Sequence, residues 1–206
     1  PGETQGGQVT RVRATALDSL SSFLSTNFGY ATGPYEGYSH ETPSLRLTAK
    51  LDYAMNDKNK FSLRYTKLDS KTDVLLSNSS SLGWGSRRSS LQGLNFQNSN
   101  YQILENIESV VGEWNAVIGS NMSNNMIVGY TKNDESREVR GGLTGGKPFP
   151  FVDILDGNDV FTSFGFEPFT PNNELRYNSQ QFQNNFTIYG DKNDLTFGVS
   201  VERYES

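Results

Sequence analysis

The sequence predicts an all-β protein, namely a segment of an antiparallel transmembrane β-barrel with about six strands. Two observations support this fold class. Apolar and polar residues alternate in three pairs of segments, each joined by a short polar turn, and long segments without periodicity separate the pairs. Outer-membrane barrels show this order of short and long connections, because every second connection of an antiparallel sheet emerges on the same side of the membrane.

Residues 45–66 form the clearest pair. Apolar side chains stand at every second position before the turn "NDKNK" and again after it, with polar side chains between them. The apolar positions are Leu45, Leu47, Ala49, Leu51, Tyr53, Met55, Phe61, Leu63 and Tyr65. A side-chain period of two places them on one face of a strand pair, so the sequence predicts a β-hairpin with one apolar face and one charged face.

Two further hairpins are expected in residues 103–134 and 180–204. Both show the same alternation around a short turn, "GSNMSN" in the first and "DKND" in the second. The main apolar positions are Val110, Trp114, Ile118, Met126, Val128 and Tyr130 in the first, and Phe182, Phe186, Leu195, Phe197, Val199 and Val201 in the second. These faces continue the pattern of the first hairpin.

The intervening segments, residues 67–102 and 135–179, are expected to be long extracellular loops. They are rich in Ser, Asn, Gly and Phe and are longer than the usual connections of a compact domain. Residues 1–44 are expected to form another extracellular loop, with a short helix in residues 15–24, where leucines follow helical spacing. We therefore interpret the whole chain, residues 1–206, as part of one barrel.

The two faces of the hairpins are expected to meet different surroundings, because a membrane barrel is apolar outside and wet inside. The predicted lumen-facing residues are Arg46, Lys50, Asp52, Arg64, Glu113 and Glu202. Aromatic residues close to the short turns fit an interfacial girdle. They are Tyr53, Phe61, Tyr189 and Phe197, of which Tyr189 falls on the polar face of its own strand.

Composition excludes several classes of function. The chain has 206 residues and a formal net charge of −5, and its Lys and Arg residues form no stripe, so we expect no nucleic-acid partner. The absence of Cys excludes disulfides, Cys-ligated zinc and thiol catalysis. No apolar run reaches the about 20 residues of a transmembrane helix.

Residues 47–88, "LTAKLDYAMNDKNKFSLRYTKLDSKTDVLLSNSSSLGWGSRR", resemble the Oar-like TonB-dependent receptors of the Bacteroidota. Barrels of this family contain a "KLDYNINDKNK" hairpin followed by a loop similar to "DVLLSNSSSLGFGNRR". The likeness continues in "LNFQNSNYQILENIESVVGEWNAVI", "GYTKNDESREVRG", "FPFVDILDGN" and "FGFEPFTPNNEL". It covers nearly the whole chain.

The resemblance implies a bacterial outer-membrane protein with a barrel of about 22 strands and an N-terminal plug domain. It implies contact with the TonB complex through parts of the full-length protein that this sequence does not contain. We expect a middle slice of the barrel, because six strands fall short of the about eight that the smallest membrane barrels have. The partners implied are outer-membrane lipid, an unidentified substrate and other envelope proteins.

The long loops hold the candidate ligand-binding residues, which are Trp84, Arg87, Arg88, Phe149 and Phe151. Aromatic rings stack on sugars or peptides, and arginines bind anions. For the aromatic residues we favour a second interpretation, in which they bury one another and keep the loops folded. For the two arginines, a solvated charge or an ion pair within the loop is favoured over anion binding.

No catalytic or cofactor site is expected. "DILDGND" supplies oxygen ligands for calcium at Asp153, Asp156, Asn158 and Asp159, but the spacing is not that of an EF-hand, and a solvated acidic loop is favoured. The single histidine, His40, has no nucleophile beside it in the sequence, so we interpret it as a surface residue. The chain is therefore not expected to be an enzyme.

The expected function is energy-coupled uptake of an unidentified substrate, which the outer loops capture and the lumen wall guides. Two alternatives stay open. The protein could serve surface adhesion or envelope structure, or be a subunit or client of an envelope secretion or assembly machine. It could also be a soluble β-sandwich that binds glycans, with the apolar faces of two sheets packed together.

Overall fold

The computed structural model describes residues 9–78, 88 and 90–206, which form two compact units. The sheet unit comprises Pro43–Lys71, Leu104–Ser136 and Glu174–Ser206, and the loop unit comprises Pro1–Thr42, Thr72–Ile103 and Arg137–Asn173. Each unit is thus assembled from three separate stretches of the chain. The predicted hairpins build the first unit and the predicted loops build the second.

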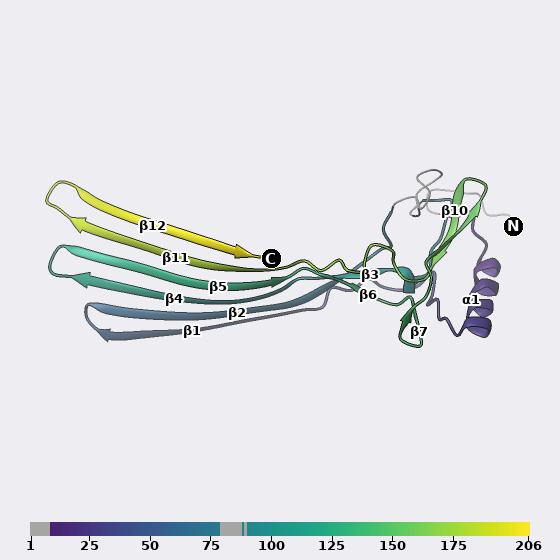
Figure 1. Ribbon diagram of the computed structural model, residues 1–206, viewed down its shortest axis with the longest axis horizontal. Helices are drawn as coiled ribbons and strands as arrows, with labels where there is room; N and C mark the ends of the chain where they lie inside the picture. The colour runs from purple at the N-terminus through teal and green to yellow at the C-terminus, as the bar shows by residue number, and fades with distance from the viewer. Residues whose placement is uncertain (1–8, 79–87, 89) are drawn as a thin grey trace. The chain divides into compact units, whose positions relative to one another are not determined.

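Six long antiparallel strands make up the sheet unit (Figure 1). They are β1 (Ser44–Asn56), β2 (Asn59–Val74), β4 (Asn106–Ile118), β5 (Met122–Asp134), β11 (Arg176–Tyr189) and β12 (Asp194–Glu205). Each pairs with the next one in this order, so the sheet is an up-and-down meander. The all-β fold class and the three predicted hairpins are confirmed.

β2 is longer than the sequence indicated. Pairing with β1 continues through Leu45 opposite Asp69 to Ser44 opposite Ser70, although the predicted hairpin ended at residue 66. The apolar alternation stops at Tyr65, because the last part of the strand, "KLDSKTDV", has polar residues on both faces and only Leu68 and Val74 as apolar ones. Residues 67–74 are therefore strand and not loop, which corrects the predicted boundary.

Each outer strand of the sheet has one partner among the long strands of the described chain. β1 pairs with β2, and β12 pairs with β11. Their other edges carry backbone N–H and C=O groups that the described strands do not satisfy. Such groups need partners in lipid, where water cannot supply them.

In its described residues, the loop unit holds one α-helix and several short strands. They are α1 (Ala14–Phe28), the 3₁₀ turn Gln97–Ser99, β3 (Tyr101–Leu104), β6 (Arg137–Val139), β7 (Leu143–Thr144), β8 (Lys147–Pro148), β9 (Val152–Asp156) and β10 (Asp159–Phe164). β3 pairs with β6, β7 with β8 and β9 with β10. The predicted loops thus contain regular structure.

α1 confirms the predicted helix and extends it to Phe28. It ends at Gly29, whose φ of +61° suits glycine because a side chain would be strained there. The Gly29 N–H donates to the Ser25 carbonyl (3.0 Å), and the Tyr30 N–H donates to that of Leu24 (3.2 Å). In the described part of the chain, no helix is long and apolar enough to cross a membrane.

The core of the loop unit draws on all three of its chain segments. Its buried members include Leu17 and Tyr30 from the first segment, Phe96 from the second and Phe164 from the third. Phe149 and Phe161 pack against this core, which agrees with the packing interpretation of the loop aromatics. The three loops therefore fold as one body.

Candidate functional site

The strand register sorts the side chains of the sheet unit onto two faces. Directly opposite residues of antiparallel strands lie on the same face, so a row can be followed from strand to strand. One such row is Lys50, Arg64, Val111, Gly129, Gln181 and Glu202. The next row toward the short turns begins with Asp52, Ser62 and Glu113. All six predicted lumen-facing residues share this face, since Arg46 lies four residues before Lys50 on β1.

Hydrogen bonds between neighbouring strands organise this polar face. The Glu113 carboxylate accepts from the side-chain amides of Asn115 (2.8 Å) and Asn125 (2.9 Å). Lys50 forms an ion pair with Asp52 (2.9 Å), and both side chains are more than half exposed. On β5, β11 and β12 the same face is formed mainly by amides and hydroxyls, which suits a wall in contact with water.

The opposite face is an apolar band. Its central row is Leu51, Leu63, Gly112, Val128, Phe182 and Val201. Nearest the turns it begins with Ile118, Met122, Ile188 and Leu195. Large members are strongly exposed, for example Leu51 at 67% and Phe197 at 62%. A largely apolar exposed surface of this kind is typical of contact with lipid.

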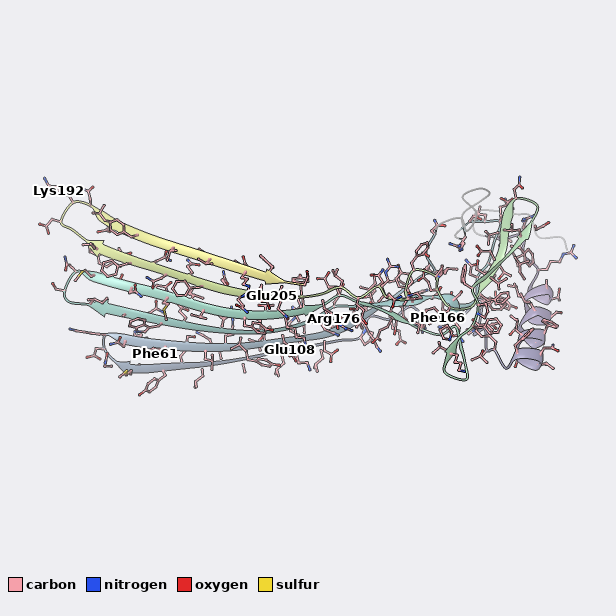
Figure 2. The ribbon with its side chains drawn as sticks, in the orientation of Figure 1. Phe61, Glu108, Phe166, Arg176, Lys192 and Glu205 are labelled. Atoms are coloured by element: carbon pink, nitrogen blue, oxygen red, sulfur yellow. The ribbon has the colours of Figure 1, made fainter. Side chains whose placement is uncertain are left out.

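Charged residues end the band at the side away from the short turns. Lys67, Glu108 and Lys132 form the first charged row, and Asp69, Asp134 and Arg176 lie beyond it. Figure 2 shows Glu108, Arg176 and Glu205 well removed from Phe61, which lies near the turn end. From Ile118 to Val110 the band covers about 27 Å of strand, or about 20 Å across a membrane at a tilt of about 40°.

Aromatic residues line the turn end of the sheet, as predicted. On the apolar face, Phe61 stacks on Trp114 with ring centroids 6.2 Å apart, and the Trp114 indole N–H donates to the Asn59 side chain (3.1 Å). Tyr189 lies on the polar face, where its hydroxyl is 2.9 Å from that of Ser123. Rings with an apolar body and a polar tip suit a membrane interface.

The buried aromatic cluster of the loop unit includes a polar contact. Tyr30 stacks on Phe149 with ring centroids 4.2 Å apart, and its hydroxyl oxygen accepts the backbone N–H of Gly165 (2.9 Å). Burial raises the pKa of the Tyr30 hydroxyl, while the hydrogen bond from Gly165 lowers it in part. Phe149, a candidate ligand-binding residue for which packing was the favoured interpretation, is thus part of the packing of this unit.

Arg88 is buried, with 2% of its side chain exposed, although it was predicted in a ligand-facing loop. Its guanidinium donates to both carboxylate oxygens of Asp153, at 3.0 Å from Nε and 2.9 Å from Nη2, and it lies 4.9 Å from the centre of the Phe151 ring. This corrects the expectation for Arg88, whose partner comes from the other long loop. Trp84 and Arg87 lie outside the described residues.

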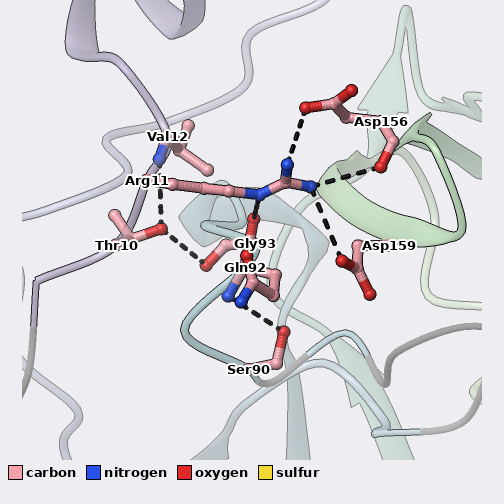
Figure 3. A network of polar contacts seen from close by, with 8 residues as sticks. All are labelled: Thr10, Arg11, Val12, Ser90, Gln92, Gly93, Asp156 and Asp159. Carbon is pink, nitrogen blue, oxygen red and sulfur yellow. Dashed lines mark hydrogen bonds and ion pairs between the residues drawn. The ribbon is translucent and has the colours of Figure 1, made fainter.

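The acidic segment considered for calcium pairs with arginines instead. Asp153 binds Arg88. Asp156 (2.8 Å) and Asp159 (3.9 Å) bind Arg11, as Figure 3 shows. Nε of Arg11 also donates to the Gln92 carbonyl (3.3 Å). Within the described residues, no three His, Asp or Glu side chains are grouped to hold a metal ion. These ion pairs tie the acidic hairpin to the rest of the loop unit.

The loop unit also contains a cavity of about 460 Å³ that the sequence did not indicate. Tyr38, Leu75, Leu76 and Leu94 supply apolar walls, and Arg88, Asn95 and Asn100 add polar ones. No sequence pattern indicated this cavity, because its lining residues follow no period. The mixture of apolar walls and a few polar groups is typical of small-molecule sites.

The fold and its two faces define this chain as an outer-membrane β-barrel protein. Residues 3–206 match the family model of the outer membrane beta barrel domain, so the chain belongs to this family. Membership places it in the bacterial outer membrane and assigns the apolar band to the lipid side. Comparisons with curated proteins and with solved structures found no match.

Proposed function

We propose that the chain is the barrel segment of an Oar-like TonB-dependent receptor that takes up an unidentified substrate. One observation carries the proposal: a sheet with a lipid-facing band and an opposite polar wall is continuous in the chain with a folded loop unit that contains a cavity. A structural barrel needs the lipid-facing band, but it needs neither a hydrogen-bonding wall nor a cavity in its loops.

In this proposal the two units have successive roles. The cavity of the loop unit captures the substrate, and Tyr38 and the leucines around it provide the contact surface. The polar wall, with Lys50, Arg64 and Glu113, then offers charged and amide groups along the lumen. No covalent step occurs in this chain, so the protein is not an enzyme, and energy enters through the TonB complex elsewhere in the full-length receptor.

Cysteine labelling of the full-length protein in living cells tests the proposal. We expect Lys50→Cys to react with a membrane-impermeant maleimide, and to react at least several-fold more slowly when TonB is deleted or the proton-motive force is collapsed. Leu51→Cys, one residue away on the lipid face, is the matched control and stays unlabelled in all conditions. Equal labelling of residue 50 with and without TonB would contradict a transport role.

Surface adhesion is a second candidate, and one observation favours it. α1 exposes Phe23 (53%) and Phe28 (52%), whose rings pair edge to face at 5.8 Å. Adjacent exposed aromatic rings are typical of protein contacts. If adhesion is the function, replacing both residues with Ser abolishes attachment of cells to a surface while TonB deletion has no effect.

A further inference from the structure

The cavity of the loop unit has mostly aliphatic walls. They are formed by Leu75, Leu76, Leu91 and Leu94 together with the ring of Tyr38. Its volume of about 460 Å³ lies within the range of about 300–1,000 Å³ that is usual for small-molecule sites. Leu75 and Leu91 are 54% and 57% exposed, so large apolar side chains at this cavity remain in contact with water. An aliphatic group that entered would remove this surface from water, which is favourable.

The charge of the cavity wall is already neutralised. Arg88 is the one charged residue in the part of the lining that the structure describes, and only 2% of its side chain is exposed. Its guanidinium donates to both carboxylate oxygens of Asp153 and to the Ser77 carbonyl. An ionised ligand would therefore lose water without gaining an opposite charge, and burial of an unpaired charge is strongly unfavourable. The wall thus favours an uncharged ligand.

Tyr38 can donate a hydrogen bond to a ligand. Its hydroxyl oxygen accepts from Nδ2 of Asn100 (3.3 Å), and Oδ1 of Asn100 accepts the Leu76 N–H (3.0 Å). The proton of the Tyr38 hydroxyl therefore points away from Asn100, and none of the described residues accepts it. A carbonyl or hydroxyl oxygen of a ligand would be a suitable acceptor.

Asn95 adds an acceptor that lacks a donor. Its Nδ2 donates to the Arg88 carbonyl (3.1 Å), while its Oδ1 is buried and accepts no hydrogen bond from the part of the chain that the structure describes. Buried polar atoms are nearly always hydrogen-bonded, so an exception beside a cavity requires an explanation. An N–H or O–H group of a ligand would supply the missing donor.

We propose that the cavity binds an uncharged aliphatic molecule with a group that both accepts and donates hydrogen bonds, such as an amide or a hydroxyl. The aliphatic part lies against the leucines, the oxygen accepts from Tyr38, and the N–H or O–H donates to Asn95. This inference rests on the proposed function for the role of the cavity in uptake, and it specifies the class of substrate. Carboxylates, phosphates and amines are excluded by the missing countercharge.

Three leucine derivatives of similar size test the proposal, because they differ mainly in charge. At about pH 6, N-acetyl-leucinamide is neutral, N-acetyl-leucine is an anion and leucinamide is a cation. Titrations followed by saturation-transfer NMR measure their affinities for the full-length protein in nanodiscs. We expect the neutral derivative to bind at least about ten-fold more tightly than either charged one, because a charge would be buried without a partner. Equal affinities would overturn the proposal, and so would tighter binding of the anion, which would show that Arg88 accepts a ligand.

Two variants and two matched controls locate the binding. Leu91→Asn changes an exposed wall residue and Tyr38→Phe removes only a hydroxyl, and each is expected to weaken binding of the neutral derivative several-fold. Leu143 is a 41% exposed leucine outside the lining, and the Tyr35 hydroxyl donates to Asp18 (3.0 Å), so Leu143→Asn and Tyr35→Phe leave binding unchanged. If the two cavity variants bind as well as the controls do, the derivative binds elsewhere and the proposal is wrong.

The labelling experiment at residue 50 separates this proposal from the proposed function, because binding of the derivatives is measured without TonB. Selective binding together with TonB-independent labelling would support the binding site and refute transport. TonB-dependent labelling without selectivity among the derivatives would support transport and refute the proposed class of substrate.

Discussion

The ion pair of Arg88 and Asp153 is expected to hold two of the three loops together, those of residues 72–103 and 137–173. Its side chains are 2% and 7% exposed, and Asp153 also accepts the hydroxyl of Ser163 (2.6 Å), while Arg88 donates to the Ser77 carbonyl (3.2 Å). Arg88→Met leaves the Asp153 carboxylate buried without a countercharge. Removal of one partner of a buried pair costs about 3–5 kcal/mol, so we expect a loss of that size in the stability of the loop unit.

Replacing both partners is expected to cost much less. In Arg88→Met/Asp153→Leu no uncompensated charge stays buried, and apolar replacement of a buried pair is often close to neutral. Arg11→Met is the matched control in the same unit, because the Arg11–Asp156 pair is far more exposed and such pairs contribute about 0–1 kcal/mol.

Hydrogen–deuterium exchange of the full-length protein measures these differences, with the amides of the sheet unit as an internal reference. About 3–5 kcal/mol corresponds to exchange that is about a hundred- to several-thousand-fold faster in the loop unit, at about 1.4 kcal/mol per factor of ten. Acceleration below ten-fold for Arg88→Met, or a double variant as damaged as the single one, would refute the reasoning. Either result would restore Arg88 as a candidate ligand-binding residue.

Three further predictions concern both units. Val128→Arg places a charge at the middle of the lipid-facing band and is expected to lower barrel stability by about 2–4 kcal/mol. Ile127→Arg, on the neighbouring position of the polar face, is the control and is expected to cost under about 1 kcal/mol. Denaturant titration of the protein in vesicles measures both losses. Asn124 and Asn184 exchange two hydrogen bonds (2.9 and 3.1 Å) on the lipid side, so either single Val variant destabilises the barrel more than the double variant does in the same titration. Because the pKa of Tyr30 is raised in the folded protein, the neutral hydroxyl stabilises the loop unit fully below about pH 10, and this stabilisation is lost as pH rises through the folded-state pKa. Protease sensitivity of the loop unit is therefore expected to increase above about pH 10, and Tyr30→Phe is expected to make this increase smaller.

The faces of the strands were predictable from the sequence, because a strand in a membrane barrel is apolar on one side and wet on the other. Leu51 and Asp52 are neighbours in the chain and meet different surroundings, and their polarity alone shows it. This signal exists only where lipid lies against one face. Beyond Tyr65 polar residues occur on both faces of β2, so the strand from Lys67 to Val74 gave no alternation and was predicted as loop.

The contacts of the loop unit were not predictable, since they join residues that are distant in the chain. Arg88 and Asp153 are 65 residues apart, and the surrounding sequence predicted only a solvated charge or an ion pair within the loop. The helix gave a local signal in its leucines, and Gly29 could have marked its end.

The division of the loop unit among three stretches of the chain determines the order in which the protein can mature. Leu17, Phe96 and Phe164 complete one another's burial, so no loop can reach its final state before the third has been exported. The loop unit therefore folds late in biogenesis, and its folding indicates that the earlier hairpins have been inserted correctly. For the same reason, deleting one loop would expose the apolar residues of the other two and unfold the unit. Only point substitutions can therefore distinguish a loss of ligand binding from a loss of folding.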